Sequence, residues 1–268
     1  MPTLHVRRRG VGPPLVLIHG VAGSGLIWEQ VVQRLPDLDV IAIDLLGYGH
    51  SAKPRLAYTP QVHVDAIVDT LDAIGVQQPA YVVGLSMGSL LAVELAARHP
   101  NRVRAVGCIA LPYYRDEAEA RRELRVNPWT GLVIRAPQVA RVVIPALWGL
   151  GRRSRLLSRA FAPRFYTAEV ARESMMPTYQ AFASTLTECM LRNRIEPTLD
   201  AVAGVPMSLL HGGADKWCPA ERVAGMLAGR DNCTLRVVDG IGHNLAVLAP
   251  DECAAVISRL VSDYPPLP

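Results

Sequence analysis

One serine in the chain has neighbours that would make its hydroxyl reactive. Ser86 lies between Gly84 and Gly88, after the apolar run 80–83 and before an apolar-periodic stretch that ends at His99. At a sharp turn from strand to helix, a serine takes a strained backbone conformation, and glycines two residues away on each side let the chain segments approach closely. The pattern predicts a nucleophilic serine that takes part in acyl transfer.

A serine nucleophile needs a base, and His243 is the strongest candidate. It follows an apolar, strand-like run that ends at Val238, and it lies in the glycine-containing loop 240–244. Histidine is the side chain best suited to exchange protons near neutral pH. A single loop histidine is more often a surface residue, so this assignment depends on the other members of the site.

The orienting carboxylate is expected at Asp215, in the loop after the strand-like run that ends at Leu210. Such a group would hold the imidazole in position and stabilise its protonated form. Taken alone, an aspartate in a glycine-rich loop is better explained as a turn former.

Backbone N–H groups would have to receive the negative charge that develops on the substrate oxygen. The glycine-rich segment 19–25 follows the first central strand and would offer one donor near Val21. Met87, directly after the serine, would offer the second backbone N–H. The alternative is a glycine-rich turn that binds no ligand, and it is weakened because the loop follows the strand after which the serine turn needs its partner.

Short apolar runs alternate with longer helical patterns, which predicts the α/β class, with a mostly parallel central sheet flanked by helices. The expected strands are 15–18, 40–43, 81–83, 106–109, 208–210 and 235–238. The expected helices are 59–74, 86–98, 220–228 and 251–263. Since the carboxyl ends of parallel strands meet at one edge of a sheet, the candidate residues can converge there.

The alternation fails between Tyr113 and about Pro206, where prolines divide the chain into short helical pieces. We therefore expect a core formed by residues 1–112 and 207–268 and an inserted helical cap at 113–206. The apolar stretch 139–150 would line an acyl-binding pocket or dip into a lipid surface. A helix packed on the core is the simpler alternative for this stretch.

Taken in order, these segments resemble the α/β-hydrolase superfamily, of the serine esterase type with an inserted helical cap. The motifs that carry the resemblance are His19-Gly20, Asp44-Leu45-Leu46-Gly47-Tyr48-Gly49-His50-Ser51, Gly84 to Gly88, Arg98-His99-Pro100, Asp215 with Pro219, and Gly242-His243. The resemblance implies a triad of Ser86, Asp215 and His243, in the chain order that this fold uses. It implies that Asp44, the rival carboxylate, shapes a loop instead.

Three departures from the family pattern limit which members of the superfamily this chain resembles. The first of the usual eight strands would be absent or merged with residues 4–8. Ser89 stands where related carbon–carbon bond hydrolases often have glycine, and Ser86 argues against dehalogenases and epoxide hydrolases, which use aspartate. The remaining histidines are not expected to be bases: His19, His99 and His211 fit turns or helix ends, and His5, His50 and His63 lack a partner motif.

The composition is that of a soluble protein with one core. Half of the 268 residues are apolar, and no uncharged apolar stretch approaches the ~20 residues that span a bilayer. The basic amino terminus lacks a signal-peptide core, so we expect a cytoplasmic protein with no transmembrane segment. The five scattered cysteines favour reduced thiols, and no cofactor or metal is expected.

Positive charge is concentrated in the middle of the chain, where segment 113–200 holds half of the 28 basic residues, all of them arginines. Such a surface could attract an acidic acyl-carrier protein, an anionic substrate or a membrane, although a solvated helical face explains most of these arginines. Nucleic acid is not an expected partner, because the aromatic residues of a stacking platform are absent.

These features predict a serine hydrolase that cleaves a carboxylic ester or related acyl bond through an acyl-enzyme on Ser86. A small, apolar acyl substrate is suggested by the apolar cap residues 139–150, Phe161, Phe165, Met175, Met176 and Phe182. Two further classes stay open. One is a non-hydrolytic enzyme of the same fold, such as an acyltransferase, a hydroxynitrile lyase or a cofactor-free haloperoxidase. The other is a ligand-binding receptor with a silent triad.

Overall fold

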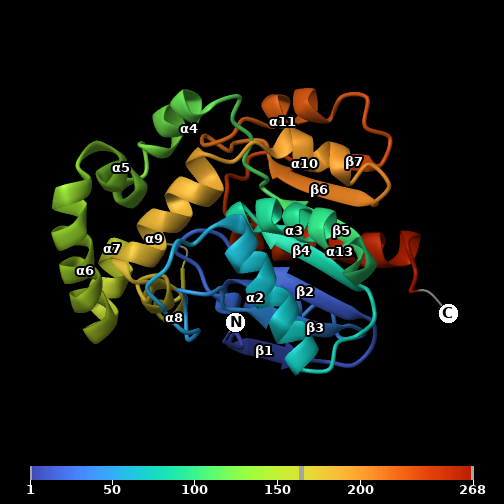
Figure 1. Cartoon of the computed structure of the whole chain (residues 1–268), viewed down its shortest axis with the longest axis horizontal. Helices are drawn as coiled ribbons and strands as arrows, with labels where there is room; N and C mark the ends of the chain where they lie inside the picture. The colour runs from blue at the N-terminus through green and yellow to red at the C-terminus, as the bar shows by residue number, and fades with distance from the viewer. Residues whose placement is uncertain (1, 163–165, 267–268) are drawn as a thin grey trace.

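A mostly parallel sheet forms the centre of the molecule (Figure 1). The structure is a computed structural model that describes residues 2–162 and 166–266, and within these ranges seven strands pair in the order β1-β3-β2-β4-β5-β6-β7. The strands are β1 (Val6–Arg9), β2 (Pro14–Ile18), β3 (Asp39–Ile43), β4 (Ala80–Leu85), β5 (Val103–Ile109), β6 (Met207–Gly212) and β7 (Cys233–Val238). Each of the six predicted strands is present and extends beyond its predicted run, which confirms the α/β class.

The amino-terminal strand β1 lies at the edge of the sheet and runs antiparallel to β3, whereas the other neighbouring strands pair in parallel. Its register pairs Val6 with Ile43 and Arg9 with Val40. The predicted edge change therefore takes the form of one short strand that covers the edge of β3.

Helices cover both faces of the sheet, because its central strands are apolar on both sides. On one face lie α2 (Pro60–Ala73) and α3 (Met87–Arg98), and on the other lie α1 (Glu29–Val32) and α13 (Pro250–Asp263). Alternate strand residues point to opposite faces, so Val16 and Ile18 join the α2–α3 side while Leu15 and Leu17 join the α1–α13 side. The remaining short elements of the core are η1 (Gly25–Trp28), η2 (Pro100–Arg102), α11 (Ala220–Leu227) and α12 (Leu245–Leu248).

Local sequence signals set the helix boundaries. Thr59 caps α2, since its side chain accepts the N–H of Val62, and Pro60 occupies the first turn. Gly75, just past the helix, has a φ of 77°, a left-handed conformation that glycine adopts without strain. These boundaries fall within one residue of those predicted from the sequence.

Between β5 and β6 the chain forms a helical segment that lies beside the sheet (Figure 1). Its elements are α4 (Glu117–Leu124), α5 (Pro128–Arg135), α6 (Pro137–Arg153), α7 (Arg155–Phe161), α8 (Ala168–Glu173), α9 (Tyr179–Thr185), the π-helical turn η3 (Leu186–Leu191) and α10 (Ile195–Ala201). The last of these, α10, contacts α3 of the core. We use the word cap for the elements from α4 to η3.

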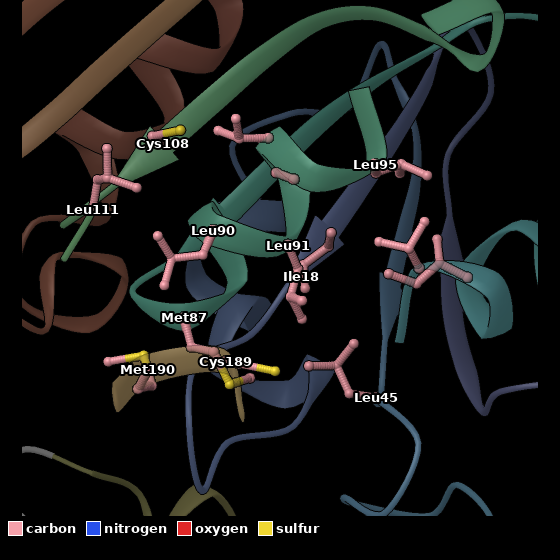
Figure 2. Close-up of a cluster of buried hydrophobic side chains, with 14 of the residues drawn as sticks. Ile18, Leu45, Met87, Leu90, Leu91, Leu95, Cys108, Leu111, Cys189 and Met190 are labelled. Carbon is pink, nitrogen blue, oxygen red and sulfur yellow. The ribbon is translucent and has the colours of Figure 1, made fainter. Parts of the chain in front are cut away.

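The cap and the core share one apolar cluster. Figure 2 shows Met87 of α3 beside Met190 of η3, and both belong with Leu90 to one cluster of buried side chains. A fully buried side chain of this size contributes roughly 1.5–3 kcal/mol through the hydrophobic effect. The helix that begins at the predicted nucleophile is therefore packed directly against the cap.

No helix among the described residues combines the length and the apolar character that a membrane crossing requires. The five cysteines are free thiols, and Cys108, Cys189, Cys218 and Cys253 are buried. Burial raises the pKa of the Cys218 thiol to about 11, so this residue near Asp215 is a packing residue rather than a reactive thiolate.

Candidate active site

Ser86 occupies a sharp, strained turn between β4 and α3. Its φ of 55° and ψ of −122° are unusual for a residue with a side chain. A Cβ added to Gly84 would lie 2.1 Å from the backbone of Gly88, and one added to Gly88 would lie 2.3 Å from the carbonyl oxygen of Ile18. Both glycines are therefore required by close packing, as the sequence predicts.

Hydrogen bonds beneath the turn fix its shape. The backbone N–H of Ser86 donates to the carbonyl of Ile109 at 2.8 Å. The buried Ser89 hydroxyl donates to the carbonyls of Gly84 and Ile109, at 2.8 and 3.1 Å. Ser89, which departs from the glycine common in related enzymes, thus ties the first turn of α3 to the ends of β4 and β5.

The structure brings Ser86, His243 and Asp215 together, although they lie on three separate loops. The Ser86 Oγ is 2.8 Å from Nε2 of His243, and Nδ1 of His243 is 2.7 Å from Oδ2 of Asp215. Donation from Nδ1–H to the carboxylate leaves Nε2 as the acceptor for the serine proton. The ring of Trp217 packs on the imidazole, with 4.5 Å between ring centroids.

The Asp215 carboxylate is buried but well supplied with donors. Burial raises its pKa, yet the hydrogen bond and charge of His243 and the N–H of Trp217 outweigh this effect and hold the pKa below its usual value. Oδ1 accepts the backbone N–H groups of Trp217 and Cys218 at 2.9 and 3.3 Å, which leaves Oδ2 for His243. The carboxylate is thus kept ionised and oriented.

His211 lies close to the same carboxylate, with its Nε2 3.5 Å from Oδ2 of Asp215. The same nitrogen is 2.7 Å from the carbonyl oxygen of Cys218, to which it donates. Burial lowers the pKa of His211, so it is a neutral group that anchors the Asp215 loop. It belongs to β6 itself, so the prediction of a turn or helix-end position was wrong for this histidine.

The glycine-rich loop after β2 lies against the serine turn. A Cβ added to Gly20 would approach the Cβ of Ser86 to 3.2 Å. The N–H of Gly23 donates to the carbonyl of Gly20 at 3.1 Å, and Ala22 takes a φ of 54°, so a tight turn contains Val21. Met87 is the first residue of α3, where backbone N–H groups have no partner within the helix.

A cavity of about 140 Å³ opens between this site and the cap, and its walls are mainly apolar and aromatic. Trp148 of α6 forms edge-to-face contacts with Trp129 of α5 and Phe182 of α9, with ring centroids 5.7 and 5.1 Å apart. Residues of the core and of the cap share the lining, which includes Val21, Ser86, Trp217, His243, Tyr114, Trp129, Trp148, Met175, Phe182, Leu186 and Met190.

The pocket residues predicted from cap composition are only partly correct. Met175 and Phe182 line the cavity, whereas Met176 does not, and the stretch 139–150 contributes only Trp148. Phe165 lies outside the described residues, as does the side chain of Phe161. Among the residues that the structure describes, no group of three His, Cys, Asp or Glu side chains is arranged to hold a metal ion.

Comparison with known proteins agrees with this fold. The family model described as the alpha/beta hydrolase fold matches residues 13–250. The chain belongs to the α/β-hydrolase family. It is 27% identical over 262 residues to the 2-(acetamidomethylene)succinate hydrolase of Mesorhizobium japonicum, which covers 97% of this chain and 91% of that protein.

Two further similarities of this α/β-hydrolase are to a lipase sequence and to a solved structure. It is 38% identical over 149 residues to Lipase LipV of Mycobacterium tuberculosis, over 47% of this chain and 56% of that protein. The crystal structure of E-2-(acetamidomethylene)succinate hydrolase superposes with a TM-score of 0.76 at 23% identity, covering 97% of this chain and 95% of that one. This last likeness confirms the fold.

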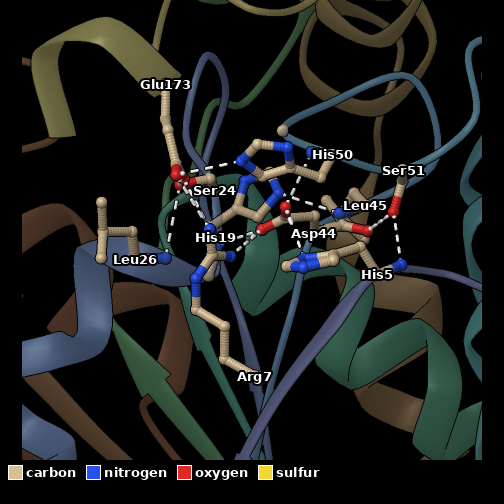
Figure 3. Close-up of polar contacts among 12 residues, drawn as sticks. His5, Arg7, His19, Ser24, Leu26, Asp44, Leu45, His50, Ser51 and Glu173 are labelled. Atoms are coloured by element: carbon tan, nitrogen blue, oxygen red, sulfur yellow. Dashed lines mark hydrogen bonds and ion pairs between the residues drawn. The ribbon is translucent and has the colours of Figure 1, made fainter. Parts of the chain in front are cut away.

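In this α/β-hydrolase, Asp44 is the centre of a second polar cluster, which does not include Ser86, His243 or Asp215 (Figure 3). The buried carboxylate accepts the backbone N–H groups of Gly25 and His50, at 2.7 and 2.8 Å, and the guanidinium of Arg7 at 2.7 Å. Nδ1 of His5 is 3.0 Å from Oδ2 of Asp44, the oxygen that also accepts the N–H of His50. The prediction that Asp44 shapes a loop is confirmed.

The cluster extends into the cap through Glu173 of α8, a residue that sequence reasoning missed. Its carboxylate accepts the hydroxyl of Ser24 at 2.5 Å and lies 3.3 Å from Nε2 of His50. Glu173 and Ser24 lie 149 residues apart in the chain, and no motif surrounds the glutamate. The spacing of two residues from buried Ala171 and from buried Met175 is not a helical spacing, so no sequence signal pointed to its burial.

Proposed function

We propose that this α/β-hydrolase cleaves a carboxylic ester, or a related acyl bond, of a small apolar substrate through an acyl-enzyme on Ser86. The observation that carries the proposal is the pair of contacts at the cavity wall. Oγ of Ser86 is 2.8 Å from Nε2 of His243, whose Nδ1 is 2.7 Å from Oδ2 of Asp215. This arrangement suits a serine nucleophile, its base and the acid that orients the base.

In the first half of the reaction, Oγ of Ser86 attacks the acyl carbon while its proton passes to Nε2 of His243. The Asp215 carboxylate stabilises the resulting imidazolium. The carbonyl oxygen becomes an oxyanion, for which we assign the backbone N–H groups of Val21 and Met87 as donors. Each such donor contributes roughly 2.7–4 kcal/mol to stabilisation of the transition state.

The tetrahedral intermediate then collapses, and His243 returns the proton to the departing alkoxide, so that an alcohol leaves and the acyl group stays on Ser86. A water molecule attacks the acyl-enzyme while His243 removes one of its protons. Collapse of the second intermediate releases the carboxylic acid, and the proton on His243 returns to Oγ of Ser86.

The cavity lining favours a neutral acyl group. Its described residues include no lysine or arginine, so a carboxylate placed among them would lack a cationic partner. The 2-(acetamidomethylene)succinate of the relative's name carries two carboxylates. We therefore propose that this chain acts on uncharged acyl esters and turns over succinate-type substrates poorly.

The same three residues would serve an enzyme that transfers the acyl group to an acceptor other than water, or one that cleaves a cyanohydrin. A putative non-heme haloperoxidase of Mycobacterium phage D29 is 28% identical over 265 residues, which favours peroxide as one acceptor to test. Product analysis in the presence of a competing alcohol, thiol or peroxide distinguishes these reactions from hydrolysis.

The decisive experiment measures initial rates on p-nitrophenyl esters from acetyl to dodecanoyl. Ser86→Ala is expected to lower the rate by ~10³-fold or more without lowering the melting temperature. Ser258→Ala, the same change at an exposed position of α13, is the matched control and keeps the wild-type rate. A clear optimum in acyl length would give the size of the pocket.

Residual turnover near the wild-type rate in the Ser86→Ala protein would contradict the proposed nucleophile. Tight binding of an acyl compound without any turnover in the wild type would favour a receptor that keeps a silent triad.

A further inference from the structure

Helix α6 is apolar on two opposite sides. Its buried side is formed by Ala140, Ile144, Trp148 and Gly151, at helical spacings of four, four and three. The opposite side carries Val139, Val142, Ala146 and Leu150, all exposed. A helix that only covered a pocket would carry polar residues on this outer side.

Helix α7, which contacts α6, continues the exposed apolar surface. Leu156 and Leu157 are exposed there, and Leu156 keeps 79% of its surface accessible. Of the nine large aliphatic side chains exposed among the described residues, five lie on α6 and α7. Such a concentration marks an interaction site, whereas isolated exposed aliphatic residues need no explanation. We call this outer side of α6 and α7 the α6–α7 surface.

The α6–α7 surface is also strongly cationic. The sequence from 124 to 168 contains no aspartate and no glutamate, and its basic residues are all arginines. Within this stretch the exposed arginines of the two helices are Arg141, Arg152, Arg153, Arg155 and Arg159. Arg155 lies 3.5 Å from Glu169, while Arg141, Arg153 and Arg159 form no ion pair with any described residue.

We propose that the α6–α7 surface docks on the surface of an anionic lipid bilayer. Exposed aliphatic residues flanked by arginines fit the boundary between headgroups and acyl chains, where hydrocarbon takes up the aliphatic groups and lipid phosphates pair with guanidinium groups. Each arginine held near an anionic membrane strengthens the attraction. Both attractions arise from exposed side chains of the same two helices.

Other occupants fit this surface less well. A second copy of the chain would bring two acid-free, arginine-rich surfaces together, so like charges would oppose the contact. An acidic carrier protein would neutralise the arginines but would also have to cover aliphatic residues on both α6 and α7. A bilayer supplies both negative charge and a hydrocarbon phase.

This docking would bring the candidate active site close to lipid. Trp148 lies on the buried side of α6 and lines the cavity, whereas Val142 lies on the outer side of the same helix. One helix therefore separates the proposed lipid contact from the cavity, and an acyl chain leaving the bilayer would have a short path to Ser86.

The test is co-sedimentation of the full chain with vesicles of phosphatidylcholine alone and with vesicles of equal parts phosphatidylcholine and phosphatidylglycerol. We expect binding to the anionic vesicles that weakens with added salt, and little binding to the neutral ones. Binding does not require catalysis, so Ser86→Ala protein is expected to bind equally. The result is thus separate from the outcome for the proposed function.

Two double variants on the α6–α7 surface, each with a control at another exposed site, test where the vesicles bind. Val142→Asp/Leu156→Asp is expected to weaken binding at least tenfold, whereas Val11→Asp, at an equally exposed valine between β1 and β2, is not. Arg141→Gln/Arg153→Gln is expected to weaken binding about tenfold or more. Arg9→Gln/Arg259→Gln removes the same charge elsewhere and is expected to change binding little. Circular dichroism and the rate on a soluble ester check that each variant is folded.

Absence of binding to the anionic vesicles would overturn the proposal, and so would control variants that lose as much binding as the α6–α7 variants. Self-association, or capture of a purified acidic carrier protein, that is lost in the same variants while vesicles stay unbound would also overturn it.

Discussion

Arg7 of β1 donates two hydrogen bonds of 2.9 Å to the two carboxylate oxygens of Glu173 on α8. A strand at the sheet edge thus holds a helix of the cap, across 166 residues of sequence. The same glutamate accepts the hydroxyl of Ser24, whose loop contains Val21. One ion pair therefore joins the edge of the core, the cap and the loop that we assign to the oxyanion.

Replacing Glu173 tests this connection. Glu173→Gln removes the buried negative charge that pairs with Arg7, and it is expected to lower the free energy of unfolding by about 1–3 kcal/mol. It is also expected to lower kcat more than it raises KM, because the Ser24 loop loses an anchor. Urea denaturation and ester kinetics measure both effects.

The matched control is Glu169→Gln on the same helix. The Glu169 side chain is about half exposed and lies 3.5 Å from Arg155, so its loss is expected to cost about 0.5 kcal/mol or less. Equal effects of the two substitutions would show that the buried pair holds nothing in place.

Asp215→Asn tests the role that we propose for the carboxylate in orienting His243. An amide can present its N–H₂ group to Nδ1 of His243 and favour the tautomer that carries its proton on Nε2, where it cannot accept from Ser86. We expect kcat for ester hydrolysis to fall by roughly 10⁴-fold while the fold is kept. Asp239→Asn, at an exposed position after β7, is the control. A loss of less than tenfold would remove Asp215 from the triad.

The residues around Ser86 could be predicted because their constraints are local. A serine between two glycines, placed between a strand and a helix, leaves few structural alternatives. Asp215 and His243 could be placed because each follows a strand-like run, and the carboxyl ends of parallel strands meet at one edge. The sheet was also predictable from local signals, because its buried strands appear in the sequence as short apolar runs.

The contacts of Glu173 and Trp148 could not be predicted, because they depend on how short cap helices fold back on the core. The cap lacks the strand–helix alternation that fixes the rest of the topology, so apolar composition alone cannot separate a cavity wall from an outer surface. Val142 and Trp148 lie on the same helix, yet Val142 is exposed and Trp148 is buried. Sequence analysis also gave no partner to His50, which lies within 3.3 Å of Glu173.

Two glycine-to-alanine substitutions test whether close packing requires the glycine beside Ser86. Gly84→Ala is expected to destabilise the protein by more than about 3 kcal/mol, because the new Cβ would lie 2.1 Å from backbone atoms of α3. Gly225→Ala, inside α11 with no atom within 4 Å of the new Cβ, is expected to stabilise it by about 0.5–1 kcal/mol. Thermal and urea unfolding measure both changes. Similar shifts in the two variants would refute the packing argument at Ser86.

Acid sensitivity is expected to arise partly from Asp44. Burial alone would raise the pKa of this carboxyl. The hydrogen bonds from the N–H groups of His50 and Gly25 and the charges of His19 and Arg7 outweigh burial, so the pKa lies below its ordinary value of 3.8. The unfolded chain therefore binds this proton at higher pH than the folded protein does. The stabilisation is complete above the ordinary pKa and is lost as the pH falls through the folded value.

We thus expect the free energy of unfolding to fall as the pH drops below about 4, with a contribution from Asp44. Asp44→Asn is expected to be less stable near neutral pH and to show a shallower decline in acid, since the titrating group is gone. Asp239→Asn again provides the exposed control. Urea denaturation at a series of pH values checks both slopes. Parallel curves for the wild type and Asp44→Asn would mean that other carboxylates carry the acid sensitivity, and that the Asp44 cluster fixes the loop geometry without coupling it to protons.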